Sequence, residues 1–182
     1  MKKVLFITLL LFMGLQMGCD APEPRRPINK KKQYFLSQSA QRNKSRMANE
    51  QALFQNIRND EPQREYQNSS KGFWYAIIEG EAVQKPLPIK GEEVVMRYRI
   101  EDLSGNVLYD EEQLGEVRFL VDQEDYLPAL REAAKVLREG QKGIFLFPSY
   151  LCFGYQGDFE KIGSNQPLRF VIKLVSLSKF NS

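Results

Sequence analysis

Four large apolar side chains crowd one loop of this sequence, and they are the first residues whose types could form a binding site. They are Tyr150, Leu151, Phe153 and Tyr155. The apolar run 143–147 before them is typical of a buried strand, and Pro148 ends it because proline has no amide hydrogen for a strand ladder. A loop with so many aromatic rings either covers the core of its own domain or lines an apolar pocket. The loop alone leaves both interpretations open, and the first is the simpler.

The composition excludes most hydrolytic and metal-dependent chemistry. The 182 residues contain no histidine, which removes Ser-His-Asp and Cys-His nucleophile pairs and the common metal sites built on histidine. The two cysteines, Cys19 and Cys152, are 133 residues apart, a spacing that fits no zinc-binding knuckle. We therefore expect no metal ion and no cofactor. We expect Cys152 to be a small buried residue rather than a nucleophile.

Residues 1–18 have the layout of an export signal. Two lysines at the start precede an uncharged, mostly apolar run at residues 4–15, which is too short to span a bilayer comfortably. A cysteine follows soon after, as in the signals of bacterial lipoproteins, which are cleaved before a lipidated cysteine. We therefore expect a signal peptide at residues 1–18 and a lipid anchor at Cys19. The alternatives are an ordinary signal peptide that is cut elsewhere and an uncleaved anchor.

Residues 19–71 differ in character from the rest of the chain. Three prolines between residues 21 and 27 indicate an extended spacer. Residues 33–59 lack glycine and proline and predict a helix with a broken apolar stripe. Residues 19–71 carry 11 Lys and Arg against 6 Asp and Glu, whereas residues 72–182 carry 13 against 17. The basic region is either a solvated spacer or a segment that lies on anionic lipid headgroups. Because the folded domain is acidic, we expect no nucleic-acid partner.

Residues 72–182 predict one globular domain. The whole chain is 42% hydrophobic and 12% aromatic, which is enough to bury a core. Strands are predicted at residues 73–78, 92–101, 107–109, 117–121, 143–147 and 168–175. A helix is predicted at 127–137, with Pro128 in its first turn and Gly140 after its end. Because the connections between strands are short, we expect an α+β fold in which a five-stranded antiparallel sheet wraps around one short helix.

Short motifs across this domain have the order and spacing of one known family. In chain order they are Lys90-Gly91, Arg97-Tyr98, Tyr109-Asp110, Val117-Arg118-Phe119-Leu120, Tyr126-Leu127-x-x-Leu130, Gly140-Gln141-Lys142, Pro148 to Gly154, and Pro167-Leu168-x-Phe170. Each motif is weak alone, but together they span the domain, which resembles the FKBP-type peptidyl-prolyl cis-trans isomerases. With its lipoprotein-like signal and charged helical segment, the chain as a whole resembles the gliding-motility-associated isomerase lipoproteins of Bacteroidetes.

This resemblance implies roles for individual residues. The catalytic residues would be Tyr98, Asp110 and Phe153. The residues that bind substrate would be Tyr109, Phe119, Tyr126, Leu127, Leu130, Ile162 and Phe170. Leu127 would hold a substrate carbonyl with its backbone amide. A hydrogen bond from a partner such as Tyr98 would compensate Asp110 for its burial.

Two of these positions depart from the pattern of the family. Leu130 stands where the family has a tryptophan, so the pocket floor offers less contact area than an indole. Phe153 stands where the family has a tyrosine, so it lacks a hydroxyl whose hydrogen bond is usually worth about 0.5–1.5 kcal/mol. We therefore expect isomerase activity that is reduced but not abolished.

The resemblance implies a peptidyl-prolyl isomerase that assists the folding of exported proteins, with proline-containing polypeptides as its partners. A lipid at Cys19 would anchor it to a membrane of the cell envelope, facing the periplasm, and the narrower resemblance implies service to the gliding-motility machinery. The alternative function is a catalytically weak chaperone or scaffold, in which the helical segment is the working part. An isomerisation assay discriminates between the two.

Overall fold

The computed structural model of this chain describes residues 30–80 and 85–179. The predicted signal peptide at residues 1–18 and the predicted lipidation site Cys19 lie outside the described residues. The chain divides into two compact units, Met1–Ser39 and Ala40–Ser182. Among the described residues, no helix combines the length and the apolar character that a membrane span requires.

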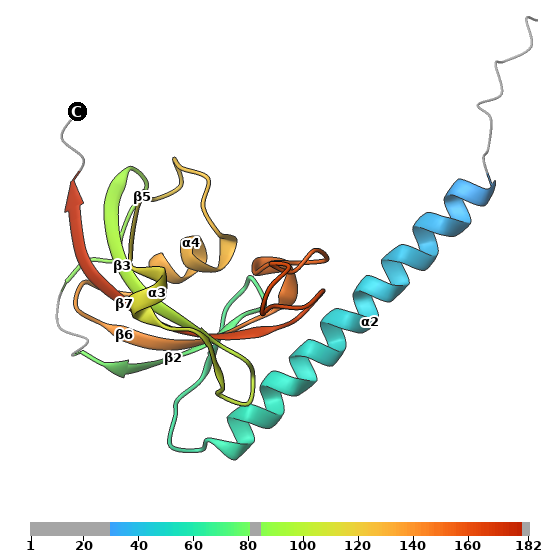
Figure 1. The fold of residues 1–182 in the computed structure, drawn as a ribbon, viewed down its shortest axis with the longest axis horizontal. Coiled ribbons are helices and arrows are strands. Elements are labelled where there is room, and N and C mark those ends of the chain that lie inside the picture. Colours follow the sequence, from blue (N-terminus) through green and yellow to red (C-terminus); the bar gives the residue numbers. More distant parts are fainter. Residues whose placement is uncertain (1–29, 81–84, 180–182) are drawn as a thin grey trace, which may run out of the picture. The chain divides into compact units, whose positions relative to one another are not determined.

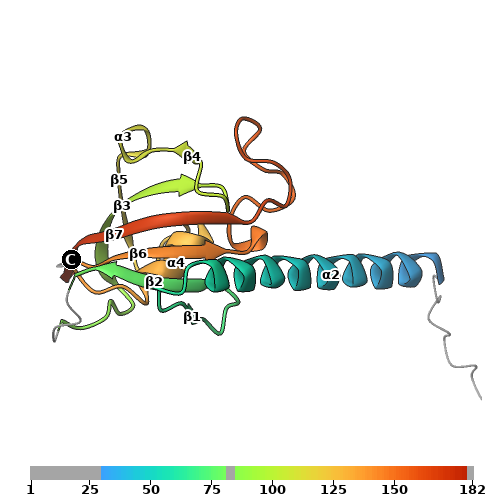
Figure 2. The same cartoon turned by 90° about the horizontal axis from the view of Figure 1, so that it is seen from below.

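One antiparallel sheet organises the second unit, and its described residues form seven strands (Figures 1 and 2). They are β1 (Gln67–Asn68), β2 (Trp74–Glu79), β3 (Glu92–Glu101), β4 (Val107–Tyr109), β5 (Glu116–Leu120), β6 (Lys142–Phe147) and β7 (Leu168–Lys179). Their order across the sheet is β1-β2-β6-β7-β3-β4, and β5 also pairs with β3. The predicted α+β fold with an antiparallel sheet is confirmed. The sheet exceeds the expected five strands because short segments such as the two-residue β1 also pair.

The helices of the described residues are α2 (Lys30–Asp60), α3 (Glu111–Leu114), α4 (Pro128–Ala134) and the 3-10 turn η2 (Ser149–Leu151). The helix predicted at residues 33–59 is confirmed as α2. The helix predicted at 127–137 is shorter in the structure: α4 ends at Ala134, and a turn follows at residues 135–136. Helix α3 was not predicted; it is a single turn that follows β4 directly.

Strands β3 and β7 form the centre of the sheet by pairing along the whole of β3. The predicted bounds of β3, residues 92–101, agree with the structure. Its alternating apolar residues all join one buried cluster, as the pattern predicts; they are Val94, Met96, Tyr98 and Ile100. Strand β7 continues past its predicted end at residue 175 because Leu177 still pairs with β3.

Apolar side chains cover both faces of this sheet. Phe145 and Phe147 of β6 join the cluster around α4, which lies against one face (Figure 1). Ile144 and Leu146 belong to a second cluster on the opposite face, where Phe54 of α2 is fully buried. Successive strand residues point to opposite faces. The continuous apolar run in β6 therefore follows from burial on both sides.

An ion-pair network ties the end of α2 to the sheet. Glu61 accepts hydrogen bonds from Arg64 (2.5 Å), Tyr66 (2.7 Å) and Arg169 of β7 (3.0 Å). Arg169 is only 8% exposed, and its Nε also lies 3.3 Å from Oε2 of Glu101. Burial works to raise the pKa of Glu61, but the hydrogen bonds from Tyr66 and Arg64 and the charge of Arg169 outweigh it, so this pKa lies below its ordinary value. The folded state therefore favours the ionised carboxylate.

We expect Glu61→Gln to lower the free energy of unfolding at pH 7 by about 2 kcal/mol, because hydrogen bonds to charged groups are worth about 1.5–3 kcal/mol. A carboxyl with a lowered pKa stabilises the fold above its ordinary pKa of 4.5, and this contribution is lost as the pH falls through the folded value. Urea titrations should therefore show the gap between parent and variant shrinking below pH 4.5. Glu65→Gln changes an exposed carboxylate of the same loop and is the control. Equal effects of the two variants would contradict the prediction.

Candidate functional site

The structure gathers nine of the ten residues predicted for the binding site into the apolar cluster around α4. Five of them are buried: Tyr98, Phe119, Leu130, Ile162 and Phe170. Four are half-buried and pack against the same cluster: Tyr109, Tyr126, Leu127 and Phe153. The tenth, Asp110, does not belong to it. The half-buried members form a rim, because they are the part of this set that reaches solvent.

Four of the predicted site residues form two stacked ring pairs within this cluster. The rings of Tyr98 and Phe170, on the neighbouring strands β3 and β7, have centroids 6.0 Å apart and planes within 6° of parallel. Phe119 and Tyr126 stack at 5.2 Å and 11°. Burial, followed by the neighbouring Tyr126, raises the pKa of Tyr98 to about 12. The hydroxyl of Tyr98 therefore stays protonated at neutral pH and can donate a hydrogen bond.

Helix α4 supplies a buried apolar side chain and a backbone donor. Leu130 is fully buried. Leu127 precedes the helix, and its carbonyl accepts the amides of Leu130 (2.9 Å) and Arg131 (3.2 Å). Within the described residues its own amide donates to no protein acceptor, as is usual at the start of a helix. An amide in this state, beside half-buried apolar side chains, can bind a carbonyl oxygen of a ligand.

A tight turn holds Phe153 at the rim. The carbonyl of Ser149 accepts the amides of Cys152 (3.1 Å) and Gly154 (3.0 Å), which flank Phe153 in the chain. Gly154 has a φ of +59°, a left-handed conformation that glycine adopts without a steric penalty. In turn, the carbonyl of Gly154 accepts the amide of Asn165 at 2.7 Å. The position of Phe153 therefore depends on the polar groups of Ser149.

The aromatic loop both covers the core and reaches solvent, so the two interpretations of its sequence each hold for part of it. Leu151 and Phe153 pack against the cluster around α4, whereas Tyr150 is 45% and Tyr155 is 81% exposed. Cys152 is buried, as expected. Burial raises the pKa of its thiol well above the usual range, so this cysteine is a poor nucleophile.

A second loop of the site is held by Asp158. The hydroxyl of Tyr109 donates to its Oδ2 at 2.5 Å, and its Oδ1 accepts the amides of Glu160 (2.9 Å) and Ile162 (2.7 Å). The Nζ of Lys161 lies 4.5 Å from the centre of the Tyr109 ring. The hydrogen bond to Asp158 raises the pKa of Tyr109 to about 12. One carboxylate therefore fixes both Tyr109 and Ile162.

Asp110 lies apart from the cluster. It is exposed, and its Oδ1 accepts the amide of Gln113 at 2.8 Å as the N-cap of α3. This cap takes the place of the expected hydrogen bond with Tyr98. The neighbouring Tyr109 packs against the cluster instead, because successive residues at a strand end point to opposite sides. A catalytic role for Asp110 stays a prediction, without support from a contact to the other site residues.

Sequence reasoning missed two carboxylates that shape the site, Asp158 and Glu50. Asp158 follows Gly157, and an aspartate that bonds the amide two residues on is a common turn signal, so it could have been found. Glu50 lies in the broken stripe of α2, where the sequence gives no sign of burial. No group of three or more cysteine or carboxylate side chains that could hold a metal ion occurs in the described part of the chain.

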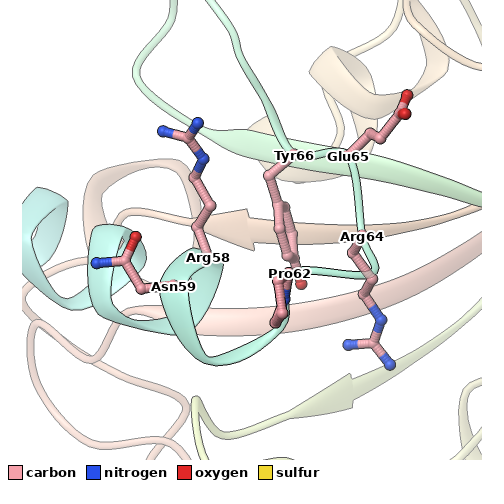
Figure 3. A pocket seen from close by; sticks show the side chains of 6 residues that line it. All are labelled: Arg58, Asn59, Pro62, Arg64, Glu65 and Tyr66. Carbon is pink, nitrogen blue, oxygen red and sulfur yellow. The ribbon is translucent and has the colours of Figure 1, made fainter.

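A cavity of about 610 Å³ lies elsewhere, between the end of α2 and β1 (Figure 3). Its lining residues are Arg58, Asn59, Pro62, Arg64, Glu65 and Tyr66, and none of them belongs to the predicted site. Figure 3 shows Arg58 and Arg64 on opposite sides of Tyr66. The guanidinium of Arg58 lies 5.7 Å from the ring centre of Trp74, and Arg64 pairs with Glu61. These side chains thus serve the attachment of α2.

Comparison with known sequences identifies the family of this fold. Residues 85–175 match the family described as FKBP-type peptidyl-prolyl cis-trans isomerase. A curated relative, the probable FKBP-type peptidyl-prolyl cis-trans isomerase FkpA of Neisseria meningitidis serogroup B, is 33% identical over 112 residues. The alignment covers 60% of this chain but 39% of the relative. This chain therefore matches well under half of that protein.

Two solved structures have a similar fold. A peptidyl-prolyl cis-trans isomerase from Pseudomonas syringae pv. tomato has a TM-score of 0.58 and 18% identity, and the match covers 75% of this chain and 96% of that one. FkpA from Escherichia coli has a TM-score of 0.56 and 19% identity, and the match covers 98% of this chain and 83% of that one. Because both sequence identities are below 20%, these matches show a similar fold and nothing more.

We expect Tyr109→Phe to speed hydrogen exchange at the amides of Glu160 and Ile162, because Asp158 loses the hydroxyl that holds its second oxygen. Asp110→Ala should leave these amides unchanged and cost about 1 kcal/mol of stability through the lost helix cap. Amide exchange at neutral pH, with urea unfolding of both variants, measures the two effects. Faster exchange at Ile162 in Asp110→Ala would mean that Asp110 is coupled to the site after all.

Proposed function

This chain belongs to the FKBP-type peptidyl-prolyl cis-trans isomerase family, and we propose that it is a working isomerase of X-Pro peptide bonds. The family match spans half of the chain, residues 85–175. The observation that carries the proposal is the convergence of nine residues with the expected types on one apolar cluster around α4.

The proposed reaction needs shape rather than a nucleophile. Rotation about an X-Pro bond is opposed by amide resonance, a barrier of roughly 18–20 kcal/mol, and uncatalysed exchange takes tens of seconds or longer. The twisted transition state has less charge separation than the planar amide, so an apolar site favours it relative to water. Catalysis is then preferential binding of the twisted form, and each ~1.4 kcal/mol of preference gives a tenfold rate increase.

We assign the clustered residues to this task. The stacked rings of Tyr98 and Phe170 and the Phe119–Tyr126 pair form apolar walls for the proline ring. Leu130 forms the floor. The amide of Leu127 holds a substrate carbonyl while the peptide bond twists.

The same residues set the strength of the proposed site. Leu130 gives the floor less area than an indole would, and Phe153 offers a ring without a hydroxyl at the rim. Both changes weaken binding of substrate and of transition state, so the proposed activity is modest.

We propose further that the clients are proline-containing polypeptides of exported proteins. Lipidated Cys19 anchors the protein to a membrane of the cell envelope, facing the periplasm. The support is the layout of residues 1–19, with two lysines, a short apolar run and a cysteine. Service to the gliding-motility machinery follows from the narrower resemblance of the whole chain and rests on it alone.

A protease-coupled assay tests the isomerase proposal. Chymotrypsin cleaves a short X-Pro peptide only in the trans form, so added isomerase speeds the slow phase of cleavage. The full chain should accelerate that phase in proportion to its concentration. An inactive parent would end the proposal and favour the scaffold role, with α2 as the working part.

We expect Phe153→Tyr to raise kcat/KM about two- to tenfold, because the added hydroxyl can donate a hydrogen bond worth about 0.5–1.5 kcal/mol. Tyr155→Phe makes the reverse change on the 81% exposed ring of the same loop and should leave kcat/KM unchanged. The same coupled assay measures both. An unchanged kcat/KM in Phe153→Tyr, as in the Tyr155→Phe control, would remove Phe153 from the proposed site.

We expect Cys19→Ser to prevent anchoring. The variant should accumulate as an unprocessed precursor or appear in the soluble fraction, whereas the parent should stay with membranes. Fractionation and mass determination of both proteins provide the measurement. A variant with the parent's size and membrane association would contradict lipidation at Cys19.

A further inference from the structure

Helix α2 places a buried carboxylate against the loop that carries Phe153. Glu50 is only 3% exposed. Its Oε1 accepts the hydroxyl of Ser149 at 2.6 Å, and its Oε2 accepts the amide of Ser149 at 3.2 Å. A carboxylate is costly to bury unless hydrogen bonds compensate it, and here one residue serves both oxygens. The contact joins α2, which precedes the family-matched region, to a loop within that region.

Ser149 links Glu50 to the turn that holds Phe153. Its amide and hydroxyl are both held by Glu50, while its carbonyl accepts the amides of Cys152 and Gly154 on either side of Phe153. All three polar groups of Ser149 are therefore engaged, two toward the helix and one toward the turn. If Glu50 is removed, the amide and hydroxyl of a buried serine lose their acceptor, and the turn must rearrange to satisfy them.

The charge of Glu50 also reaches the loop. Burial is the main cause that raises the pKa of the Cys152 thiol and the pKa of the Tyr150 hydroxyl, and the negative charge of Glu50 is the second cause. Tyr150 anchors the other side of the turn by donating to the carbonyl of Lys71 at 2.6 Å. The loop is thus held on one side by the helix and on the other by the segment that leads into β2.

We propose that Glu50 is a positioning residue for Phe153, so that the docked part of α2 belongs to the isomerase site. This inference rests on the proposed isomerase function. Glu50 acts through Ser149 and does not itself touch the substrate. Undocking of α2 around Glu50 therefore lowers activity by releasing the turn, even though the cluster around α4 stays intact.

Matched substitutions in the full chain test this proposal. Glu50→Ala should lower kcat/KM about tenfold, equivalent to ~1.4 kcal/mol of lost transition-state binding. Glu50→Gln keeps an acceptor for Ser149 and should recover part of that loss. Glu61→Ala is the control, because it removes a second carboxylate that ties α2 to the domain but makes no contact with the loop. It should keep the kcat/KM of the parent.

Hydrogen exchange at the amides of Cys152 and Gly154 distinguishes a specific effect on the turn from a general loosening of α2, because general loosening would leave the exchange rates of these two amides unchanged. Exchange there should quicken in Glu50→Ala and Ser149→Ala but not in Glu61→Ala, with the free energy of unfolding measured for each. Equal losses of activity in Glu50→Ala and Glu61→Ala, or unchanged exchange in Glu50→Ala, would overturn the proposal. If Glu50→Ala fails to fold, Glu50→Gln and Ser149→Ala carry the same comparison. An inactive parent would refute the isomerase function, whereas the exchange data would still decide the role of Glu50.

Discussion

Strand β6 and the first five residues of β7 are buried on both faces of the sheet, and this constraint determines which elements pack against them. Strand β6 sends Phe145 and Phe147 toward α4 and sends Ile144 and Leu146 toward Phe54 of α2. A shift of one residue in the pairing would exchange the two sets of side chains between faces. The register is therefore fixed by packing. The register in turn fixes the points at which β6 and β7 meet the loops of the proposed site.

Apolar and polar residues have different roles around the proposed site. Tyr98 and Phe170 stack because β3 and β7 are paired at this level, so the sheet itself builds the wall that we propose for the site. The carboxylates of Asp158 and Glu50 accept hydrogen bonds from backbone amides and hydroxyl groups and hold the loops in place. The side chains of the cluster itself are all uncharged, which suits the proposed reaction because its transition state is less polar than its ground state.

The strands of the sheet could be predicted from their strong periodicity, whereas the attachment of α2 to the sheet could not be predicted. The alternation in residues 92–101 is clean because one face of β3 is buried throughout. In α2, Glu50 and Phe54 are buried while Met47 and Leu53 are exposed, so the apolar pattern gives no indication of the docked face. Asp110 shows a second limit. Asp110 and Gln113 have the spacing of a capping box at a helix start, but a helix of only four residues has no apolar periodicity that would have revealed it.

The contacts of α2 also impose an order of assembly. Glu50 bonds to a residue 99 positions downstream, and Glu61 bonds to one 108 positions downstream. A chain synthesised from its N-terminus releases α2 long before β6 and β7, and closing loops of this length costs entropy that only later packing offsets. Among the described elements helix α2 is therefore made first, but its bonds to Ser149 and Arg169 can form only after those residues have been added. Until Val171 has been added, the surface that Phe54 covers is incomplete.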